Sequence, residues 1–195
     1  MTSPRPRGRP RDDTVDQRVL EAAVEELADK GIAEFSITAV AARARAAKRS
    51  IYARWPQRED LILAGMSTLA AGLVPPHTGA IADDLTILID RIAAVFVEPR
   101  LSILQRCAAE MADYPEMYAV FKRDSIDRCL AAIEDALHDA VTRGEIRSDI
   151  DPATVADTLT GTIAFRASTD RGDVLSVDRR EQLIRLLLDG LSPRG

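Results

Sequence analysis

Apolar side chains recur every three or four residues along most of this 195-residue chain. No stretch alternates apolar and polar residues as a half-buried strand does, so the pattern predicts an all-α fold. Proline and glycine interrupt the pattern at intervals and favour helix ends. This periodicity predicts about nine helices, at about residues 13–30, 37–44, 46–55, 58–73, 81–97, 100–112, 115–143, 152–168 and 178–191.

Several of the predicted helix ends carry their own signals. Ser36 is placed to cap the helix that begins at Ile37, and Asp151 followed by proline is a second N-terminal signal. Gly31 and Gly144 follow the last turn of predicted helices, where a left-handed residue commonly ends a helix. Residues 74–79 contain two prolines and predict a break between the N-terminal part and the remaining helices.

The net charge conceals an asymmetry. The chain carries 26 basic and 31 acidic side chains, a formal net charge of −5, which on its face argues against a nucleic-acid partner. Residues 1–60 hold 12 basic and 10 acidic side chains, whereas the remainder hold 14 and 21. Two clusters contain no acidic residue, one in the tail (Arg5, Arg7, Arg9, Arg11) and one at residues 43–58 (Arg43, Arg45, Lys48, Arg49, Arg54, Arg58). Two such clusters favour an electrostatic footprint for nucleic acid over a solvated face.

Other features bound the setting. No segment approaches the roughly 20 apolar residues that span a bilayer, and the first residues lack the apolar core of a secretory signal. The two cysteines, Cys107 and Cys129, make no disulfide or metal framework. We therefore expect a soluble, cytoplasmic protein with no cofactor and no membrane partner.

The two short helices predicted between residues 36 and 55 point to a function. Each spans about two turns and is too short to be stable alone, so both must pack on each other and on the first helix. The apolar contacts would come from Ile37, Val40, Ala41, Ile51 and Trp55, with Lys48, Arg49, Ser50 and Arg54 facing outward. A short basic helix braced by a preceding helix is the geometry of a helix-turn-helix that reads the major groove. The alternative is a small three-helix cap with a solvated face.

A specific pattern covers about residues 14–65. It comprises Val19 to Ala23, Gly31, the run from Ser36 to Ala44, the run from Lys48 to Pro56, and Leu61. This pattern resembles the DNA-binding domain of the TetR family of transcriptional regulators. The Pro-, Arg- and Gly-rich composition of the first residues predicts a disordered basic arm at 1–12. The resemblance implies a helix-turn-helix domain at 13–57, with its motif at about 36–55. It implies a helical ligand-binding and dimerisation domain at 58–195.

The resemblance also implies roles for the matched positions. Lys48 and Tyr52 would bind phosphates, and Arg49 and Ser50 would face base edges. Ala53 would contact a thymine methyl group, and the tail arginines would reach a minor groove or add non-specific attraction. The predicted DNA-binding set is Thr38, Arg43, Arg45, Ala47, Lys48, Arg49, Ser50, Tyr52, Ala53 and Arg54.

Two residues depart from the family's pattern. Arg45 stands in the turn where the family usually has glycine, and a positive φ there costs about 1 kcal/mol. Ala47 stands where the family often has a capping Ser or Thr, and losing a cap costs about 1 kcal/mol. We therefore expect the reading helix to be poorly ordered until it binds DNA.

The remaining two thirds of the chain would supply a dimer interface and a ligand cavity. Apolar stripes on the last two helices predict the interface, from Val155, Leu159, Ile163, Leu183, Ile184, Leu187, Leu188 and Leu191. These stripes could equally face the domain's own core. The resemblance implies an effector cavity among the middle helices, for which the candidates are Ile92, Phe96, Leu104, Cys107, Met111, Phe121, Leu130 and Phe165.

An enzyme is the rival class. His138 and Glu134, one turn apart, would make one edge of a metal site, but the sequence shows no further ligand cluster. No Gly-rich phosphate loop or nucleophile elbow is present. A second rival is a ligand- or protein-binding helical module that has lost DNA binding. We expect a non-enzymatic homodimeric repressor that binds a palindromic DNA operator and is released by a small-molecule effector.

Overall fold

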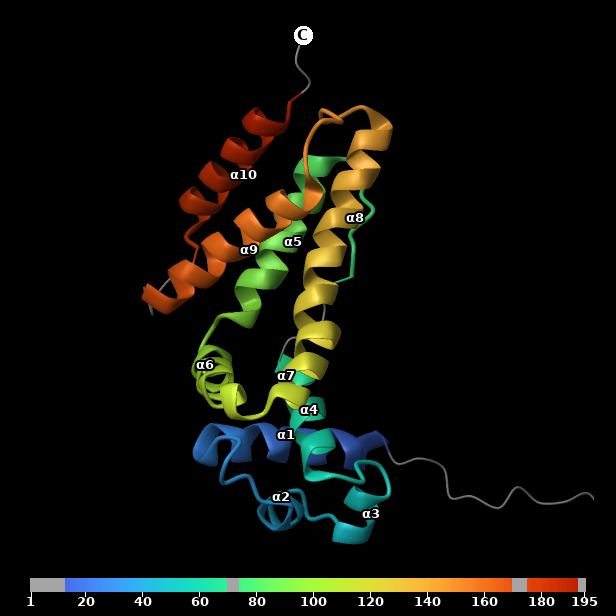
Figure 1. The fold of residues 1–195 in the computed structure, drawn as a ribbon, viewed down its shortest axis with the longest axis vertical. Coiled ribbons are helices and arrows are strands. Elements are labelled where there is room, and N and C mark those ends of the chain that lie inside the picture. Colours follow the sequence, from blue (N-terminus) through green and yellow to red (C-terminus); the bar gives the residue numbers. More distant parts are fainter. Residues whose placement is uncertain (1–12, 70–73, 170–174, 193–195) are drawn as a thin grey trace, which may run out of the picture. The chain divides into compact units, whose positions relative to one another are not determined.

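The computed structural model describes residues 13–69, 74–169 and 175–192, which form helices and loops with no strand (Figure 1). The chain divides into two compact units, Met1–Gly65 and Met66–Gly195. The division falls inside a helix, after Gly65, whereas the sequence places the boundary before Arg58. The basic arm predicted at residues 1–12 lies outside the described residues.

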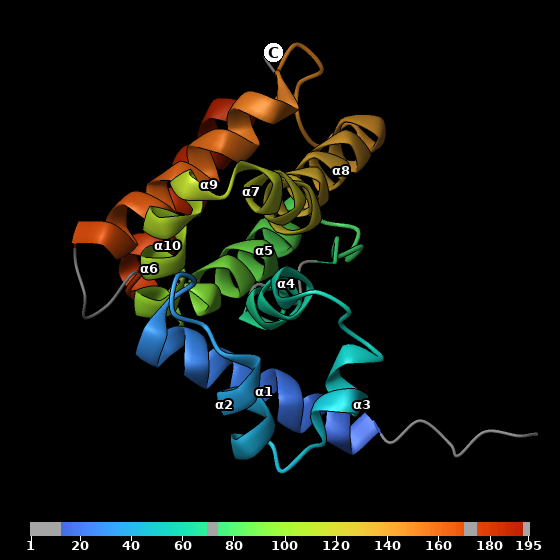
Figure 2. The same cartoon turned by 60° about the horizontal axis from the view of Figure 1, so that its bottom comes forward.

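The N-terminal unit is built on α1 (Asp13–Lys30), α2 (Ile37–Arg43), α3 (Lys48–Tyr52) and the first part of α4 (Arg58–Leu69). Both α2 and α3 lie on the same side of α1 (Figures 1 and 2). All four helices contribute fully buried apolar side chains, including Val19, Ala23, Leu27, Val40, Ile51, Leu61 and Ile62. α4 packs closely on α1, because a Cβ at Gly65 would lie 3.4 Å from the Ala23 Cβ.

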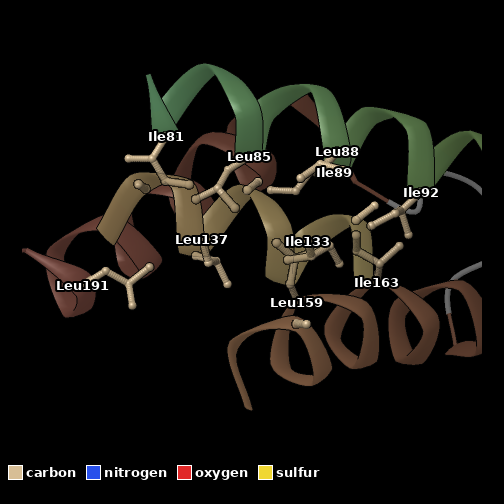
Figure 3. Packing of buried hydrophobic residues seen from close by; sticks show 14 of the residues in the cluster. Ile81, Leu85, Leu88, Ile89, Ile92, Ile133, Leu137, Leu159, Ile163 and Leu191 are labelled. Atoms are coloured by element: carbon tan, nitrogen blue, oxygen red, sulfur yellow. The ribbon is translucent and has the colours of Figure 1, made fainter. Parts of the chain in front are cut away.

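The C-terminal unit surrounds α5 (Ile81–Val95) with α8 (Asp127–Arg143), α9 (Pro152–Thr169) and α10 (Val177–Leu191). The apolar residues of α5 recur at three- and four-residue spacing, so they form one stripe that faces the other helices. Figure 3 shows this stripe packed against side chains of α8, α9 and α10. The residues labelled in Figure 3 are Ile81, Leu85, Leu88, Ile89, Ile92, Ile133, Leu137, Leu159, Ile163 and Leu191. α6 (Arg100–Glu110) and α7 (Pro115–Phe121) complete the unit.

The helix predicted at residues 115–143 is interrupted. A π-helical segment, Lys122–Ile126, joins α7 to α8, and a short 3₁₀ turn, Met111–Asp113, follows α6. When α7 and α8 are counted as one helix, the described residues hold nine helices, as the sequence predicts. The largest difference is α3, which has five residues instead of the predicted span 46–55.

The predicted helix caps are confirmed. The Ser36 side chain accepts a hydrogen bond from the Ala39 N–H, and the Asp151 carboxylate accepts one from the Thr154 N–H. Gly31 and Gly144 have φ of 71° and 75°, in the left-handed region that glycine enters at no steric cost.

The start of α5 receives its cap from a distant residue. Ala80 has no side chain that can accept the Ile81 N–H, and Glu145 Oε2 accepts it at 2.7 Å instead. The Asp84 carboxylate, which is fully buried, accepts the Thr78 N–H at 2.9 Å and its hydroxyl at 2.7 Å. These bonds tie the loop before α5 to the end of α8.

Candidate nucleic-acid interface and ligand cavity

The turn between α2 and α3 is a Schellman motif. The Ala46 N–H donates to the Ala41 carbonyl at 3.0 Å, and the Arg45 N–H donates to the Ala42 carbonyl at 3.3 Å. This pattern requires a left-handed residue after the helix, and Arg45 takes it with φ of 50°. Arg45 therefore adopts the positive φ that glycine usually takes in this turn of the family, with the backbone strain that this costs a residue with a Cβ.

The reading helix α3 begins without a side-chain cap. Ala47 has the extended backbone of an N-cap residue, and its carbonyl accepts the Ser50 N–H at 2.8 Å, but its methyl group accepts nothing. Ile51 is buried and anchors the helix, and Trp55 beyond its end is half-buried. Anchoring by one buried side chain leaves most of α3 at the surface.

Arg43 is exposed at the end of α2 and makes ion pairs with α1. Its guanidinium lies 2.6 Å from Asp29 Oδ2, 3.3 Å from Glu26 Oε2 and 3.9 Å from Glu25 Oε2, all on α1. The Glu26 side chain is 3% exposed, so Arg43 neutralises a carboxylate that is almost fully buried. This residue therefore fixes the end of α2 to α1.

Two other arginines of the basic cluster also make internal contacts. Arg54 Nε lies 2.5 Å from Asp16 Oδ1, which joins the end of α3 to the start of α1. The Arg58 guanidinium donates to the carbonyls of Ile32, Ala33 and Phe35 and lies over the Phe35 ring. Three of the six cations at residues 43–58 thus stabilise the fold of the unit.

The remaining three cations, Arg45, Lys48 and Arg49, are exposed. They lie within five residues of one another, in the turn and the first turn of α3. Thr38, Ala47, Tyr52 and Ala53 are also exposed, with 48% exposure for Tyr52, and Ser50 is partly exposed. Most of the predicted DNA-binding set is therefore exposed on α2, on α3 and in the turn between them, whereas Arg43 and Arg54 also make ion pairs with α1.

The C-terminal unit contains an apolar cavity of about 660 Å³. It is bounded by α5, α6, the end of α7, the π-helical segment, α8 and α9. The lining residues are Ile92, Val95, Phe96, Leu101, Leu104, Gln105, Ala108, Phe121, Ser125, Ile126, Cys129, Leu130, Asp157, Thr160, Gly161, Ala164 and Ser168. The volume is within the range of about 300–1,000 Å³ that small-molecule sites occupy.

Five of the eight predicted cavity residues line it: Ile92, Phe96, Leu104, Phe121 and Leu130. Cys107 and Met111 are buried outside the lining, and Phe165 is 66% exposed on the outer surface of α9. Phe165 lies two residues after the buried Ile163, which rotates it by about 200° around the helix. Burial raises the pKa of both Cys107 and Cys129 to about 11, so both thiols stay protonated near neutral pH.

The sequence prediction missed the α9 wall of the cavity. Asp157, Thr160, Gly161, Ala164 and Ser168 recur at three- and four-residue spacing and share one face of the helix. These side chains are small or polar, whereas most of the predicted cavity residues are large and apolar. The sequence signal that could have identified this wall is the stripe of small and polar residues on α9, which lies beside the buried apolar stripe of the same helix.

All eight residues predicted for the dimer interface pack against the core of their own unit. Leu159, Ile163 and Leu191 are buried there, and the other five are partly buried: Val155, Leu183, Ile184, Leu187 and Leu188. The large apolar side chains that α9 and α10 expose are Phe165, Val177 and Leu186, at 66%, 58% and 70%. Three of the predicted residues are therefore enclosed in the core, whereas the five partly buried ones keep exposed surface that a second copy of the chain can contact.

In the described part of the chain, no observation supports a metal site at His138 and Glu134 or a membrane-spanning helix. The His138 ring nitrogen Nδ1 lies 2.8 Å from the Glu134 backbone carbonyl, within its own helix. Among residues 13–69, 74–169 and 175–192, no helix combines the length and apolar character that crossing a membrane requires.

The comparisons with known proteins agree with this geometry. Residues 19–64 match the family model described as bacterial regulatory proteins of the tetR family, and residues 75–187 match the tetracyclin repressor-like C-terminal domain. An HTH-type transcriptional regulator of Mycobacterium tuberculosis is 33% identical over 150 residues, which cover 76% of this chain and 74% of that protein. The regulator AqdR of Rhodococcus erythropolis is 28% identical over 175 residues, covering 89% of this chain and 84% of AqdR.

Solved structures show the same fold. The flavonoid-responsive regulator FrrA superposes with a TM-score of 0.71 at 19% identity, over 94% of this chain and 99% of FrrA. GusR of Salmonella enterica superposes with a TM-score of 0.67 at 20% identity, over 94% of this chain and 97% of GusR.

A helix-turn-helix head joined to a helical unit defines a DNA-binding transcriptional regulator. The chain belongs to the TetR family of these regulators.

Proposed function

We propose that the protein is a repressor that binds a palindromic operator as a homodimer and is released from it by a small-molecule effector. One observation carries the DNA-binding half of this proposal: Arg45, Lys48 and Arg49 are exposed together on α3 and its preceding turn, while the other cations of the cluster make internal contacts. Such a protein works in the cytoplasm, where the chromosome of a bacterium lies.

The exposed residues divide into two roles. Lys48 and Tyr52 bind phosphates and set the register, and Arg49 and Ser50 face base edges at the start of α3. An arginine that bonds guanine through two hydrogen bonds contributes about 1–3 kcal/mol of discrimination. Thr38 contacts the backbone from α2, and Ala53 contacts a thymine methyl group.

The effector acts by shifting a population of dimers. Two reading helices fit successive major grooves when they are about 34 Å apart, or a multiple of it. Some dimers have their reading helices at a different distance and do not fit the DNA. A ligand that binds these dimers more tightly than the DNA-binding dimers lowers the DNA affinity, by as much as its affinities for the two forms differ. The cavity of about 660 Å³ supplies the ligand site, and α4 carries the change because its residues belong to both units.

The outer faces of α9 and α10 form the dimer interface in this proposal. Phe165 near the end of α9 and Leu186 in α10 are exposed apolar side chains available for it. A Leu186→Glu substitution would place two like charges near a two-fold axis, so it converts the dimer to a monomer in light scattering. An exposed Tyr118→Glu substitution on α7 is the control and leaves the dimer intact.

The test of DNA binding is fluorescence anisotropy with fragments of the DNA upstream of the protein's own gene. Each phosphate contact contributes about −0.9 to the slope of log affinity against log salt. A steep slope together with preference for one fragment supports the proposal. A slope near zero favours the alternative, a ligand- or protein-binding helical module that has lost DNA binding.

A further inference from the structure

The wall of the cavity carries charge of only one sign. Its lining contains no lysine, arginine or histidine, and Asp157 is its one carboxylate. The Asp157 side chain is exposed and has no ion-pair partner among the described residues. A ligand in the cavity therefore meets an unpaired negative charge and no compensating cation.

The polar atoms beside Asp157 on α9 also act as acceptors. The Thr160 hydroxyl donates its proton to the Ala156 carbonyl at 2.6 Å, and the Ser168 hydroxyl donates to the Phe165 carbonyl at 2.7 Å. Because each hydroxyl has one proton and that proton is used, their oxygens offer only lone pairs to the cavity. One face of α9 thus presents acceptors over nearly three turns.

The opposite walls are apolar. α5, α6, α7 and α8 contribute aliphatic and aromatic side chains, with Gln105 and Ser125 as the neutral polar exceptions. The π-helical segment adds Ser125 and Ile126 to this wall, and such segments recur at functional sites. An anion buried against these walls would meet no cation, and its only side-chain donors would be the Gln105 amide and the Ser125 hydroxyl, so its burial is costly.

We propose that the effector is a mainly apolar molecule, uncharged or carrying one positive charge, that donates hydrogen bonds to the α9 wall. A lipophilic amine or ammonium compound has this chemistry, and its nitrogen would lie beside Asp157. The cavity discriminates against lipophilic anions, such as fatty acids and other carboxylates. This inference rests on the proposed effector role of the cavity and specifies the chemical class that it accepts.

A matched pair of hydrophobic ions tests the charge preference. Tetraphenylphosphonium and tetraphenylborate have nearly the same size and shape and opposite charge, and uncharged triphenylmethanol serves as the neutral probe. Their binding to the full-length protein is measured by isothermal titration calorimetry. We expect tetraphenylphosphonium to bind about tenfold more tightly than tetraphenylborate, because a partly exposed charge contributes modestly to each, and triphenylmethanol to bind measurably.

Two variants connect this preference to the cavity. Asp157→Asn removes the charge and keeps the shape, so it reduces the preference for the cation to less than about twofold. Asp135→Asn is the control, because Asp135 is an exposed carboxylate on α8 outside the lining. A preference for the anion in the wild type, or a preference unchanged in Asp157→Asn, overturns the proposal.

Gly161 allows the cavity itself to be filled. A Cβ at this position meets no atom within 4 Å, so the side chain of Gly161→Leu can start toward the cavity without a clash at its Cβ. We expect Gly161→Leu to lose binding of all three probes with an unchanged or higher melting temperature, and Gly190→Leu, which also meets no atom, to retain binding. Probe binding that survives in Gly161→Leu places the ligand elsewhere and overturns the proposal.

The effect on DNA is measured separately by operator anisotropy with and without tetraphenylphosphonium. Binding with the expected charge preference but without any change in DNA affinity supports the cavity's chemistry and contradicts its coupling to DNA. Normal DNA binding with no charge preference in the cavity supports the DNA-binding half of the function and contradicts this inference.

Discussion

Arg45 occupies, after α2, the same position of a Schellman motif that Gly144 occupies after α8. In both turns the next residue's N–H donates to a carbonyl five residues earlier, at 3.0 Å, and the left-handed residue has a φ of 50° or 75°. Glycine enters this region freely, whereas a residue with a Cβ is strained there. The chain therefore keeps an exposed cation beside the reading helix at a cost in backbone strain.

Replacing Arg45 by glycine relieves that strain. We expect Arg45→Gly to raise the free energy of unfolding by about 0.5–1 kcal/mol, and to weaken DNA binding because it removes one exposed cation. Urea unfolding and operator anisotropy measure the two effects. Gly144→Ala is the converse control: its Cβ meets no atom within 4 Å, so any destabilisation comes from the backbone alone. A stability of Arg45→Gly at or below the wild type contradicts the prediction.

The missing cap of α3 makes the reading helix the weakest element of the head. Residues 46–50 are expected to exchange their amide protons rapidly in the free protein and to become protected on DNA. Ala47→Ser supplies the missing acceptor, so it should stabilise the helix by about 1 kcal/mol and slow exchange without DNA. Ser36→Ala, which removes the cap of α2, should have the opposite effect. Strong protection of residues 46–50 in the free wild type would show that the packing of Ile51 suffices.

Local signals predicted the helices well because the determinants of a helix lie close together in sequence. Ser36, Gly144 and Asp151 each act on the turn beside them, and the apolar stripe of α5 identifies its buried face. α3 was predicted too long because propensity favours alanine-rich helix at residues 46 and 47, whereas the Schellman turn forces an extended residue before Lys48. The π-helical segment has no recognisable signal in residues 122–126.

The functional surfaces were predicted less well because they depend on contacts between distant residues. The sequence does not distinguish Arg43 and Arg54 from Arg49, and only the structure shows that they pair with Asp29 and Asp16 on α1. The same limit applies to Leu159 and Ile163, whose stripe fits a core and a dimer interface equally well.

Arg43 should behave as a structural residue. Arg43→Ala leaves the buried Glu26 carboxylate without its cation, so we expect a loss of about 1–3 kcal/mol in the free energy of unfolding. Glu26→Gln combined with Arg43→Ala should restore part of that loss, since the unpaired charge is gone. Chemical unfolding of the two single variants and the double variant gives the coupling. Additive losses would show that the pair contributes no mutual stabilisation.

Arg49 and Lys48 should have different roles in DNA binding: Arg49 in discrimination between sequences, and Lys48 in affinity for any DNA. Arg49→Ala is expected to cost about 1–3 kcal/mol of discrimination between the operator and a single-base variant. Lys48→Ala should weaken binding to all DNA sequences alike. It should also reduce the slope of log affinity against log salt by about 1 for each protomer. Both side chains are exposed, so neither substitution should change the melting temperature. Anisotropy titrations over a range of salt concentrations distinguish the roles, and a loss of specificity in Lys48→Ala would reverse the assignment.

Glu145 should make the C-terminal unit sensitive to acid. Its hydrogen bonds with the Arg143 side chain and then with the Ile81 N–H lower its pKa from the ordinary value of 4.5. A carboxyl group whose pKa is lower in the folded state stabilises the fold above its unfolded pKa and loses that contribution as the pH falls through the folded pKa. Stability should therefore decrease below about pH 4.5, with a similar contribution from Asp151, whose pKa its bond with Thr154 lowers.

Glu145→Gln isolates this effect because the amide oxygen can still accept the Ile81 N–H while the charge is absent. Urea unfolding from pH 7 to pH 3 should show a shallower loss of stability in this variant than in the wild type. Asp135→Asn, at an exposed carboxylate without an ion-pair partner in the described part of the chain, should follow the wild-type curve. Parallel curves for Glu145→Gln and the wild type would mean that the cap on α5 stabilises the unit through its hydrogen bond and not through its charge.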